Sequence, residues 1–345
     1  MKADIHMQEI FPGLYQIPLT LSGFDPGSVN SYIIQTPEGL TAIDTGWDLP
    51  ESLASLEIQL KEIGSGLADI NQVILTHFHI DHLGFIPRLQ KIRPVKVYMH
   101  AEDLALLKIR YTAVDNFLPM TDRFLQSHGF PAIELTPPEF QLPMPNGIGA
   151  IVPDVLLHGG EDLQVGTYHL KVIHTPGHTP GHVTFYEPQR KFLVSGDMLL
   201  PNIVTNAAFH VQHIEYPLEL YLNSLRILKQ LDIDMILPGH DHIFTNARQR
   251  IDELFRDHQI KSTVILRSFD TTKPQNAYQI SQLLAVSKRT GVSRWGQMTG
   301  WEKRFAVLQT IAHLKSLEFN HKLEPILIDG IHFFRIPVAG TALAT

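Results

Sequence analysis

A dense cluster of side chains that can bind metal begins at residue 77. Four of them occupy six positions in the pattern His-x-His-x-Asp-His, and they are His77, His79, Asp81 and His82. Neutral imidazoles together with a carboxylate suit zinc or iron. The alternative is a solvated, histidine-rich loop, but nothing structural calls for so many titratable groups in one short stretch. The cluster therefore predicts a metal site.

A short apolar run leads directly into this cluster. Residues Val73 to Leu75 are apolar, two of the three are β-branched, and polar residues bound the run. Such a run is typical of a buried strand. Open α/β folds place their sites at the carboxyl ends of strands, which is where the cluster falls.

Further His and Asp residues stand at the ends of other short apolar runs. They are Asp44, His174, His178, His182, Asp197 and His240. If these runs are strands that lie side by side, all of these groups converge on one rim of the molecule. This arrangement predicts a polynuclear site with His and Asp ligands.

The remaining patterns indicate an α/β fold. Strands are expected at residues 14–17, 29–35, 40–43, 95–99, 168–173, 183–186, 192–194 and 235–237, and helices at 51–63, 84–92 and 216–231. Residues 102–130 are helical in pattern and unusually apolar. This segment is interpreted either as a lid over an acyl pocket or as outer helices that pack on the main fold.

The last hundred residues differ in composition from the rest. Helices are expected at 246–268, 280–284 and 301–317, followed by a hairpin of 325–328 and 331–336 around an Asp-Gly turn. Helices followed by a two-stranded wing resemble a winged helix. We therefore expect a catalytic domain at residues 1–245 and a small, helical, winged-helix-like domain at residues 246–345.

The bulk composition excludes several classes of protein. The chain has 345 residues, 44% of them hydrophobic and 18% charged, which is typical of a globular protein. It has no cysteine, so disulfides, thiolate metal ligands and a cysteine nucleophile are excluded. It shows neither the apolar core of a signal peptide nor a run of about 18 apolar residues. A cytoplasmic protein without a membrane partner is the expectation.

The charge is unevenly distributed. Residues 1–245 hold 14 basic and 27 acidic residues, whereas residues 246–345 hold 14 and 8, although the net charge of the chain is −7. The basic tail indicates either ordinary scatter between domains or a surface that handles a phosphate-bearing partner. Its basic and aromatic residues form no dense stripe; they include Arg289, Arg294, Trp295, Lys303 and Arg304.

Four motifs in a fixed order carry a family resemblance. They are His-x-His-x-Asp-His, Pro-Gly-His-Thr-Pro-Gly-His, Gly-Asp and Gly-His, and their set resembles the metallo-β-lactamase-fold hydrolases over roughly residues 8–245. The resemblance implies an αββα sandwich of two mixed sheets with helices outside. Carried over to this chain, it assigns one metal to His77, His79 and His178, a second metal to Asp81, His82 and His240, and a bridging role to Asp197.

The resemblance also implies roles for neighbouring residues. Asp44 would orient ligands without touching a metal, and His182 would support the site rather than bind an ion. His100, His174 and His242 are expected at the polar rim or in the core. The cofactors would be two divalent ions, usually zinc in this family and iron or manganese in some members. A metal-bound hydroxide would attack a carbonyl or phosphoryl centre, and Asp81 would orient this nucleophile or move its proton.

The substrate is indicated less directly. A lactamase-like domain followed by a winged-helix-like domain resembles the lactamase-β-like 2 proteins, which include single-strand endoribonucleases and relatives that act on carrier-protein thioesters. The first hypothesis is hydrolysis of a thioester or ester, with a small-molecule or carrier-bound acyl substrate. The alternatives are a metal-dependent endoribonuclease on single-stranded RNA and a mononuclear iron dioxygenase on the same fold. An oligomer is compatible with each.

Three residues argue against other activities of the family. Diiron oxygen reductases of this fold carry Glu where this chain has His79. The common dizinc β-lactamases carry Cys in place of Asp197. Quorum-signal lactonases often carry Tyr where this chain has Leu200.

Overall fold

The structure is a computed structural model of the 345-residue chain. It describes residues 6–23, 27–112, 114–135, 146–205, 207, 216–284 and 295–337, and for residues 114–118 only the backbone. The chain forms two compact units. Unit one comprises Met1–Val114, Leu142–Thr205 and Asn223–Ile251, and unit two comprises Asp115–Gln141, Asn206–Leu222 and Asp252–Thr345.

Unit one contains a mixed seven-stranded sheet in the order β1-β2-β3-β4-β5-β6-β7. Its strands are β1 (Gln8–Phe11), β2 (Leu14–Thr20), β3 (Ser28–Thr36), β4 (Gly39–Ile43), β5 (Ile70–Ile74), β6 (Lys96–His100) and β7 (Val155–Leu157). The first four strands pair antiparallel, whereas β4 to β7 run parallel to one another. Consequently β4, β5 and β6 all end at the same rim.

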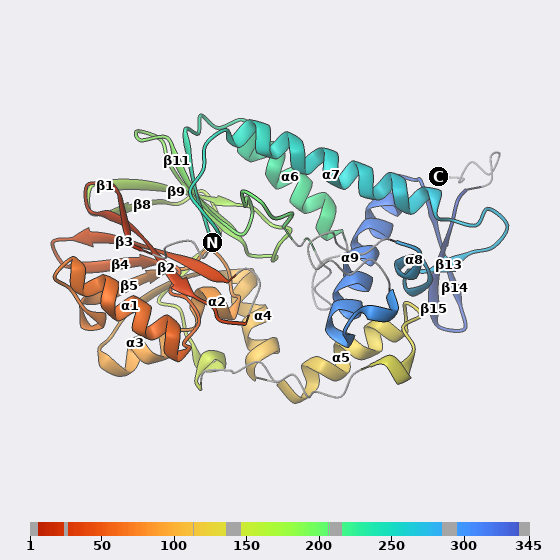
Figure 1. The fold of residues 1–345 in the computed structure, drawn as a ribbon, viewed down its shortest axis with the longest axis horizontal. Coiled ribbons are helices and arrows are strands. Elements are labelled where there is room, and N and C mark those ends of the chain that lie inside the picture. Colours follow the sequence, from red (N-terminus) through yellow and green to blue (C-terminus); the bar gives the residue numbers. More distant parts are fainter. Residues whose placement is uncertain are drawn as a thin grey trace. The chain divides into compact units, whose positions relative to one another are not determined.

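A second, five-stranded sheet has the order β12-β11-β10-β9-β8. Its strands are β8 (Asp162–Val165), β9 (Tyr168–His174), β10 (Val183–Glu187), β11 (Phe192–Gly196) and β12 (Met235–Pro238). Only β11 and β12 pair in parallel. Figure 1 shows the two sheets as separate layers, with β8 and β9 in green and β2 to β5 in red and orange.

Two apolar clusters hold these layers together. The cluster between the sheets contains Tyr32 and Ile74 from the seven-stranded sheet, and Leu170, Phe185 and Phe192 from the five-stranded sheet. Each fully buried side chain of this size contributes about 1.5–3 kcal/mol. Strands β10 and β11 are buried along their whole length because both faces are covered, whereas β9 alternates buried and exposed residues.

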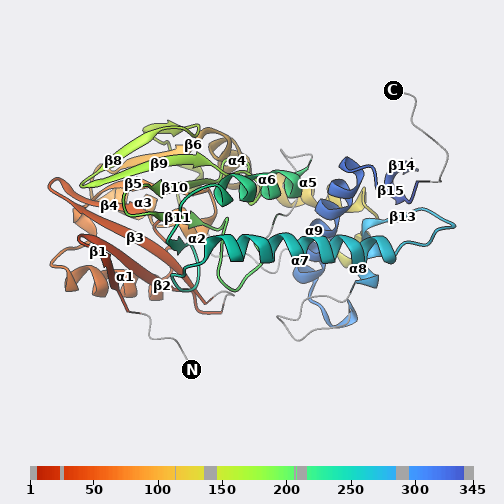
Figure 2. The ribbon, with the colours of Figure 1, turned by 90° about the horizontal axis from the view of Figure 1, so that it is seen from above.

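Helices cover the outer face of the seven-stranded sheet. The helices of unit one's first half are α1 (Pro50–Glu62), α2 (Ile80–Leu83), α3 (Ile86–Ile92) and α4 (Ala101–Thr112). Leu56 and Leu60 of α1 and Leu89 of α3 join the same buried cluster as Val73 and Val97 of the sheet. Figure 2 shows α1 along β2. The predicted α/β sandwich is confirmed, and the helix expected at 84–92 is α3, which the short, unpredicted helix α2 precedes.

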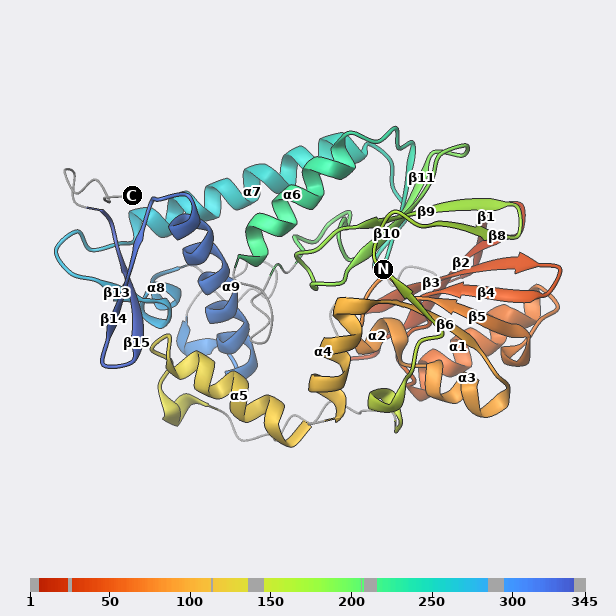
Figure 3. The same ribbon diagram turned by 180° about the vertical axis from the view of Figure 1, so that it is seen from behind.

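Unit two is built from helices and a small sheet. Its elements include α5 (Val114–Gln126), α8 (Ala277–Leu283), α9 (Gly300–Phe319), β13 (Gln275–Asn276), β14 (Glu324–Ile328) and β15 (Ile331–Arg335). The sheet has the order β13-β15-β14, which Figure 3 shows beside α8 and α9. The predicted Asp-Gly hairpin is present, because Asp329 and Gly330 both have positive φ and Ile328 pairs with Ile331.

The two units are not separated by a single boundary at residue 245. Helices α6 (Pro217–Lys229) and α7 (Ala247–Arg267) each contribute residues to both. Segment 115–141 belongs to unit two, since Arg304 pairs with Asp122 and Lys303 Nζ lies 2.8 Å from Glu134 Oε2.

No helix in the described part of the chain combines the length and apolar character that a membrane span needs. Arg289 and Arg294 lie outside the described residues.

Two buried histidines lie between α7 and α9 within unit two. His258 is 7% exposed, and its Nδ1 lies 3.5 Å from His313 Nε2. Lys261 Nζ donates to Gln309, the Ser262 hydroxyl lies 3.0 Å from His313 Nδ1, and the ring of Tyr221 contacts His258. Burial, reinforced by Lys261, lowers the pKa of His258 to about 4 and that of His313 well below its usual value.

These histidines should make unit two sensitive to acid. The unfolded chain binds a proton at His258 below pH 6.5, whereas the folded chain does so only near pH 4, so stability is lost as the pH falls through this window. We expect a loss of roughly 3 kcal/mol from His258 alone. The free energy of unfolding, measured with urea between pH 7 and 4, should depend less steeply on pH in His258→Leu than in the wild type. His321→Asn, at an exposed position of the same unit, is the control; equal slopes for all three proteins would contradict the prediction.

Candidate metal centre

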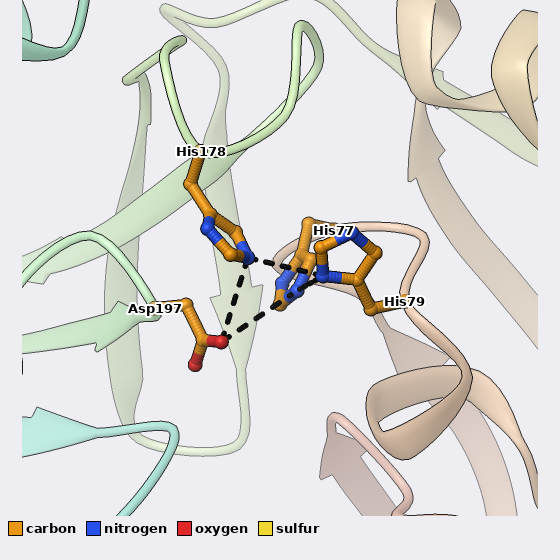
Figure 4. A group of neighbouring side chains, drawn as sticks. All are labelled: His77, His79, His178 and Asp197. Atoms are coloured by element: carbon orange, nitrogen blue, oxygen red, sulfur yellow. Dashed lines mark hydrogen bonds and ion pairs between the residues drawn. The ribbon is translucent and has the colours of Figure 1, made fainter. Parts of the chain in front are cut away.

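Four predicted ligands form what we call the first group: His77, His79, His178 and Asp197. His79 Nδ1 lies 3.0 Å from both His77 Nε2 and His178 Nε2, and Asp197 Oδ2 lies 3.5 Å from His178 Nε2. Figure 4 shows the three imidazoles and the carboxylate directed toward one another. His77 and His79 come from the loop between β5 and α2, His178 from the loop after β9, and Asp197 from the end of β11.

The second group comprises Asp81 and His82, on α2, and His240, which follows β12. Asp81 Oδ2 lies 3.3 Å from His240 Nε2 and 3.8 Å from His82 Nε2. Asp197 reaches this group as well, with one oxygen 3.5 Å from His82 Nε2 and the other 3.5 Å from His240 Nε2. The structure therefore brings all seven predicted ligands together and places Asp197 between the two groups.

Glycines allow the strand ends to approach so closely. A Cβ atom at Gly239 would lie 2.5 Å from Asp197 Oδ1 and 2.9 Å from His82 Cε1. Gly196 has a φ of +49°, and a Cβ atom there would lie 2.8 Å from His182 Nε2. Only glycine fits such positions, which explains the Gly-Asp and Gly-His pairs of the sequence.

Asp44 holds the His cluster from behind. Its buried carboxylate accepts hydrogen bonds from the backbone N–H and the hydroxyl of Thr76, at 2.8 and 2.7 Å. It also lies 2.8 Å from His82 Nδ1. Because a carboxylate oxygen accepts, Nδ1 of His82 is the nitrogen that donates to Asp44, and Nε2 is the ring nitrogen that faces Asp197. This is the orienting position that the sequence predicts for Asp44.

His182 and the backbone support the ligands that come from the five-stranded sheet. The backbone N–H of Asp197 donates to His182 Nε2 at 3.2 Å, and Thr175 contacts the other ring nitrogen. His240 Nδ1 lies 2.7 Å from the carbonyl oxygen of Ser28. Asn30 donates to the carbonyl oxygen of Pro238, which fixes the loop that carries His240. His182 lies outside both groups, as expected.

The charges of the site shift the pKa values of its imidazoles in opposite directions. Burial, together with the surrounding imidazoles, lowers the pKa of His77 well below its usual value, which keeps this ring neutral. Burial opposes ionisation of Asp197, but His240 and His82 outweigh it and lower the pKa of this carboxyl. Burial also lowers the pKa of His82, yet Asp197, Asp44 and Asp81 raise it to about 9.

Two buried atoms show that the residues fit a metal ion. His82 Nε2 and Asp197 Oδ1 have no hydrogen-bond partner among the described residues. Buried polar atoms are almost always satisfied, so these two atoms, which lie 3.5 Å from each other, are the ones that a further partner would satisfy. A divalent cation would be such a partner, and the imidazole and carboxylate donors suit zinc, iron or manganese.

Fold and site together define a candidate metalloenzyme: two mixed sheets pack against each other, and His and Asp donors from both meet at one rim. The family model of the metallo-beta-lactamase superfamily matches residues 24–240. The chain therefore belongs to this superfamily, which confirms the resemblance predicted from its motifs.

Individual relatives agree with this assignment. The probable metallo-hydrolase YqjP of Bacillus subtilis is 27% identical over 76% of this chain and 82% of its own length. The thioesterase pkgB of Emericella nidulans is 25% identical over 71% of this chain and 56% of its own length. A metallo-beta-lactamase family protein of Thermus thermophilus has a similar crystal structure, with a TM-score of 0.78 and 26% identity over 95% of this chain and 100% of its own.

The sequence interpretation missed one residue beside the site. Asp103 is fully buried near the start of α4 and contacts the loops that carry the first group. The sequence does contain a signal for Asp103, because this residue follows strand β6, the parallel neighbour of β5, at the same rim.

The three histidines expected at the rim or in the core join neither group. His100 stacks on His174, and His242 is exposed.

Proposed function

We propose that this enzyme is a dinuclear hydrolase that holds one metal ion in each group and hydrolyses an acyl thioester or ester. The observation that carries the proposal is the place of Asp197, whose two oxygens lie within 3.5 Å of ligand nitrogens from both groups. A carboxylate between two sets of donors suits a pair of ions held close together. With no cysteine in the chain, a thiolate nucleophile is excluded.

The chain's own residues would have separate tasks. Bound divalent ions supply Lewis acidity and lower the pKa of a water molecule toward neutrality. Asp81 is the most open of the carboxylates, with 24% of its side chain exposed against 11% for Asp197. It is placed to orient the nucleophile or to take its proton. Burial opposes ionisation of Asp81, but His82 and His240, the latter 3.3 Å away, outweigh it and lower the pKa of this carboxyl.

Two observations support an acyl substrate, and a third is compatible with it. A thioesterase is among the relatives, although the chain covers just over half of that protein. Residues 246–345 are basic, and coenzyme A and carrier proteins both present negative charge. The apolar segment at 102–130 forms helices α4 and α5, which suits either proposed role, a lid or an outer layer. We propose a small-molecule or carrier-bound acyl substrate, a cytoplasmic setting, and a winged-helix-like tail that aids docking.

The test is turnover by the zinc-reconstituted protein. A panel of acyl thioesters and esters should be hydrolysed by the wild type, with Asp197→Asn as the inactive reference. Cleavage of unstructured RNA with no turnover of any acyl substrate would replace this proposal by the endoribonuclease alternative. Metal analysis provides the second arm, since a single iron per chain would favour the dioxygenase alternative over a dinuclear hydrolase.

A further inference from the structure

A second buried carboxylate, besides that of Asp44, lies behind the ligands of the metal centre. Asp103 is in the first turn of α4 and is 0% exposed. Its Oδ2 accepts the backbone N–H of Phe78 at 3.0 Å and the hydroxyl of Thr179 at 2.8 Å. Its Oδ1 accepts the backbone N–H of Gly181 at 2.7 Å. All three partners are donors, so both oxygens of the carboxylate act as acceptors.

These partners sit on the two loops that supply imidazoles to the first group. Phe78 lies between His77 and His79, and Thr179 directly follows His178. The first loop follows β5 of the seven-stranded sheet, and the second follows β9 of the five-stranded sheet. A single carboxylate on α4 thus ties together two loops that come from different sheets.

The close approach of the second loop depends on Gly181. A Cβ atom at this position would lie 2.6 Å from Asp103 N and 2.8 Å from Asp103 Oδ1. Any side chain there would push the loop away from the carboxylate. Close packing therefore explains the second glycine of the Pro-Gly-His-Thr-Pro-Gly-His motif, independently of the histidine that follows it.

Asp44 and Asp103 support the site in different ways. Asp44 contacts His82 directly and His77 through the hydroxyl of Thr76, so it reaches one ligand of each group. Asp103 contacts neither Asp81 nor His82 in any hydrogen bond of the described residues. We propose that Asp103 is the positioning residue of the first group, fixing the distance between His77–His79 and His178 through Phe78 and Thr179. This inference rests on the proposed metal centre.

The decisive variant is Asp103→Asn in the full-length protein. Asparagine keeps the shape but replaces one acceptor oxygen by an N–H donor, which must face at least one of the three donors. We expect zinc affinity at the first group to fall by about 10- to 100-fold, as when other supporting partners of metal ligands are lost. The affinity of the second group should be unchanged. Stepwise competition for zinc with a chromophoric chelator measures both affinities. The binding step that is lost in His79→Gln belongs to the first group.

The cobalt-substituted protein gives a readout that general destabilisation would not produce. Its visible absorption reports the geometry of the ligands around each ion. The bands that disappear in His79→Gln belong to the first group, and Asp103→Asn should alter these bands and leave the others unchanged. Asp154→Asn is the matched control, because Asp154 accepts the N–H of Val97 at the opposite end of strand β6. We expect it to retain both zinc steps and the wild-type cobalt spectrum.

A milder variant keeps the inference testable if Asp103→Asn does not fold. Thr179→Val removes one of the three hydrogen bonds and no charge, so it should weaken only the first zinc step. Wild-type zinc affinity at the first group in the folded variant, or equal weakening of both groups, would overturn the role of Asp103. Failure of the wild type to bind zinc at all would instead overturn the proposed function.

Discussion

Asp197→Asn should release metal from both groups at once. Asp197 is the one ligand candidate among the described residues whose oxygens lie near nitrogens of the first and the second group. The variant keeps the volume of the side chain but removes the charge that His82 and His240 offset. The surrounding imidazoles would then face a neutral amide, which is a poorer ligand for a divalent cation.

The expected effect is larger than for any supporting residue. Loss of a partner behind a ligand typically costs about 10- to 100-fold in metal affinity or activity, and loss of the shared ligand should exceed this range. Metal content after dialysis and hydrolysis at saturating zinc are the two measurements. Asp241→Asn is the control, because Asp241 adjoins His240 and has a positive φ that asparagine tolerates, yet belongs to neither group. Retention of both ions by Asp197→Asn would remove the bridging assignment.

His79→Gln and His240→Gln should each lose a different ion. His79 Nδ1 is the centre of the first group, 3.0 Å from two other imidazoles, and has no part in the second. His240 Nε2 lies 3.3 Å from Asp81 in the second group. Each variant should therefore retain one zinc per chain and show a single step on titration, with a strong loss of hydrolysis in both.

The comparison between the two variants is the informative part. If both release both ions, the two groups form one cooperative site; if neither releases an ion, these residues are not ligands. His242→Gln controls for the loss of an imidazole near the site, since His242 is exposed and lies outside both groups. It should keep both zinc steps and the wild-type activity.

Much of this site could be predicted from the sequence because each ligand follows a buried strand. Buried strands are recognisable as apolar runs, and the hypothesis that these runs lie side by side predicted Asp197 and His240 near His77, although their strands belong to different sheets. Strands β1, β7 and β8 were not predicted, because they are short and partly exposed and so carry little apolar signal.

The compact units and Asp103 show what local patterns cannot reveal. Segment 115–141 joins unit two through pairs such as Arg304 with Asp122 and Lys303 with Glu134, whose members are far apart in the sequence. Nothing near Asp122 indicates which cation it meets. The position of Asp103 after strand β6 could be predicted, but the two loops that it holds are defined only by tertiary contacts.

The two sheets contribute unequal but complementary parts of the donor set. His77, His79, Asp81 and His82 follow a strand of the seven-stranded sheet, whereas His178, Asp197 and His240 follow strands of the five-stranded sheet. The full set therefore exists only after the sheets have packed, and an ion that binds it favours the folded chain by mass action. In this enzyme a bound ion would act as a cross-link between the halves of the sandwich and would add to the stability that the apolar cluster between the sheets already provides.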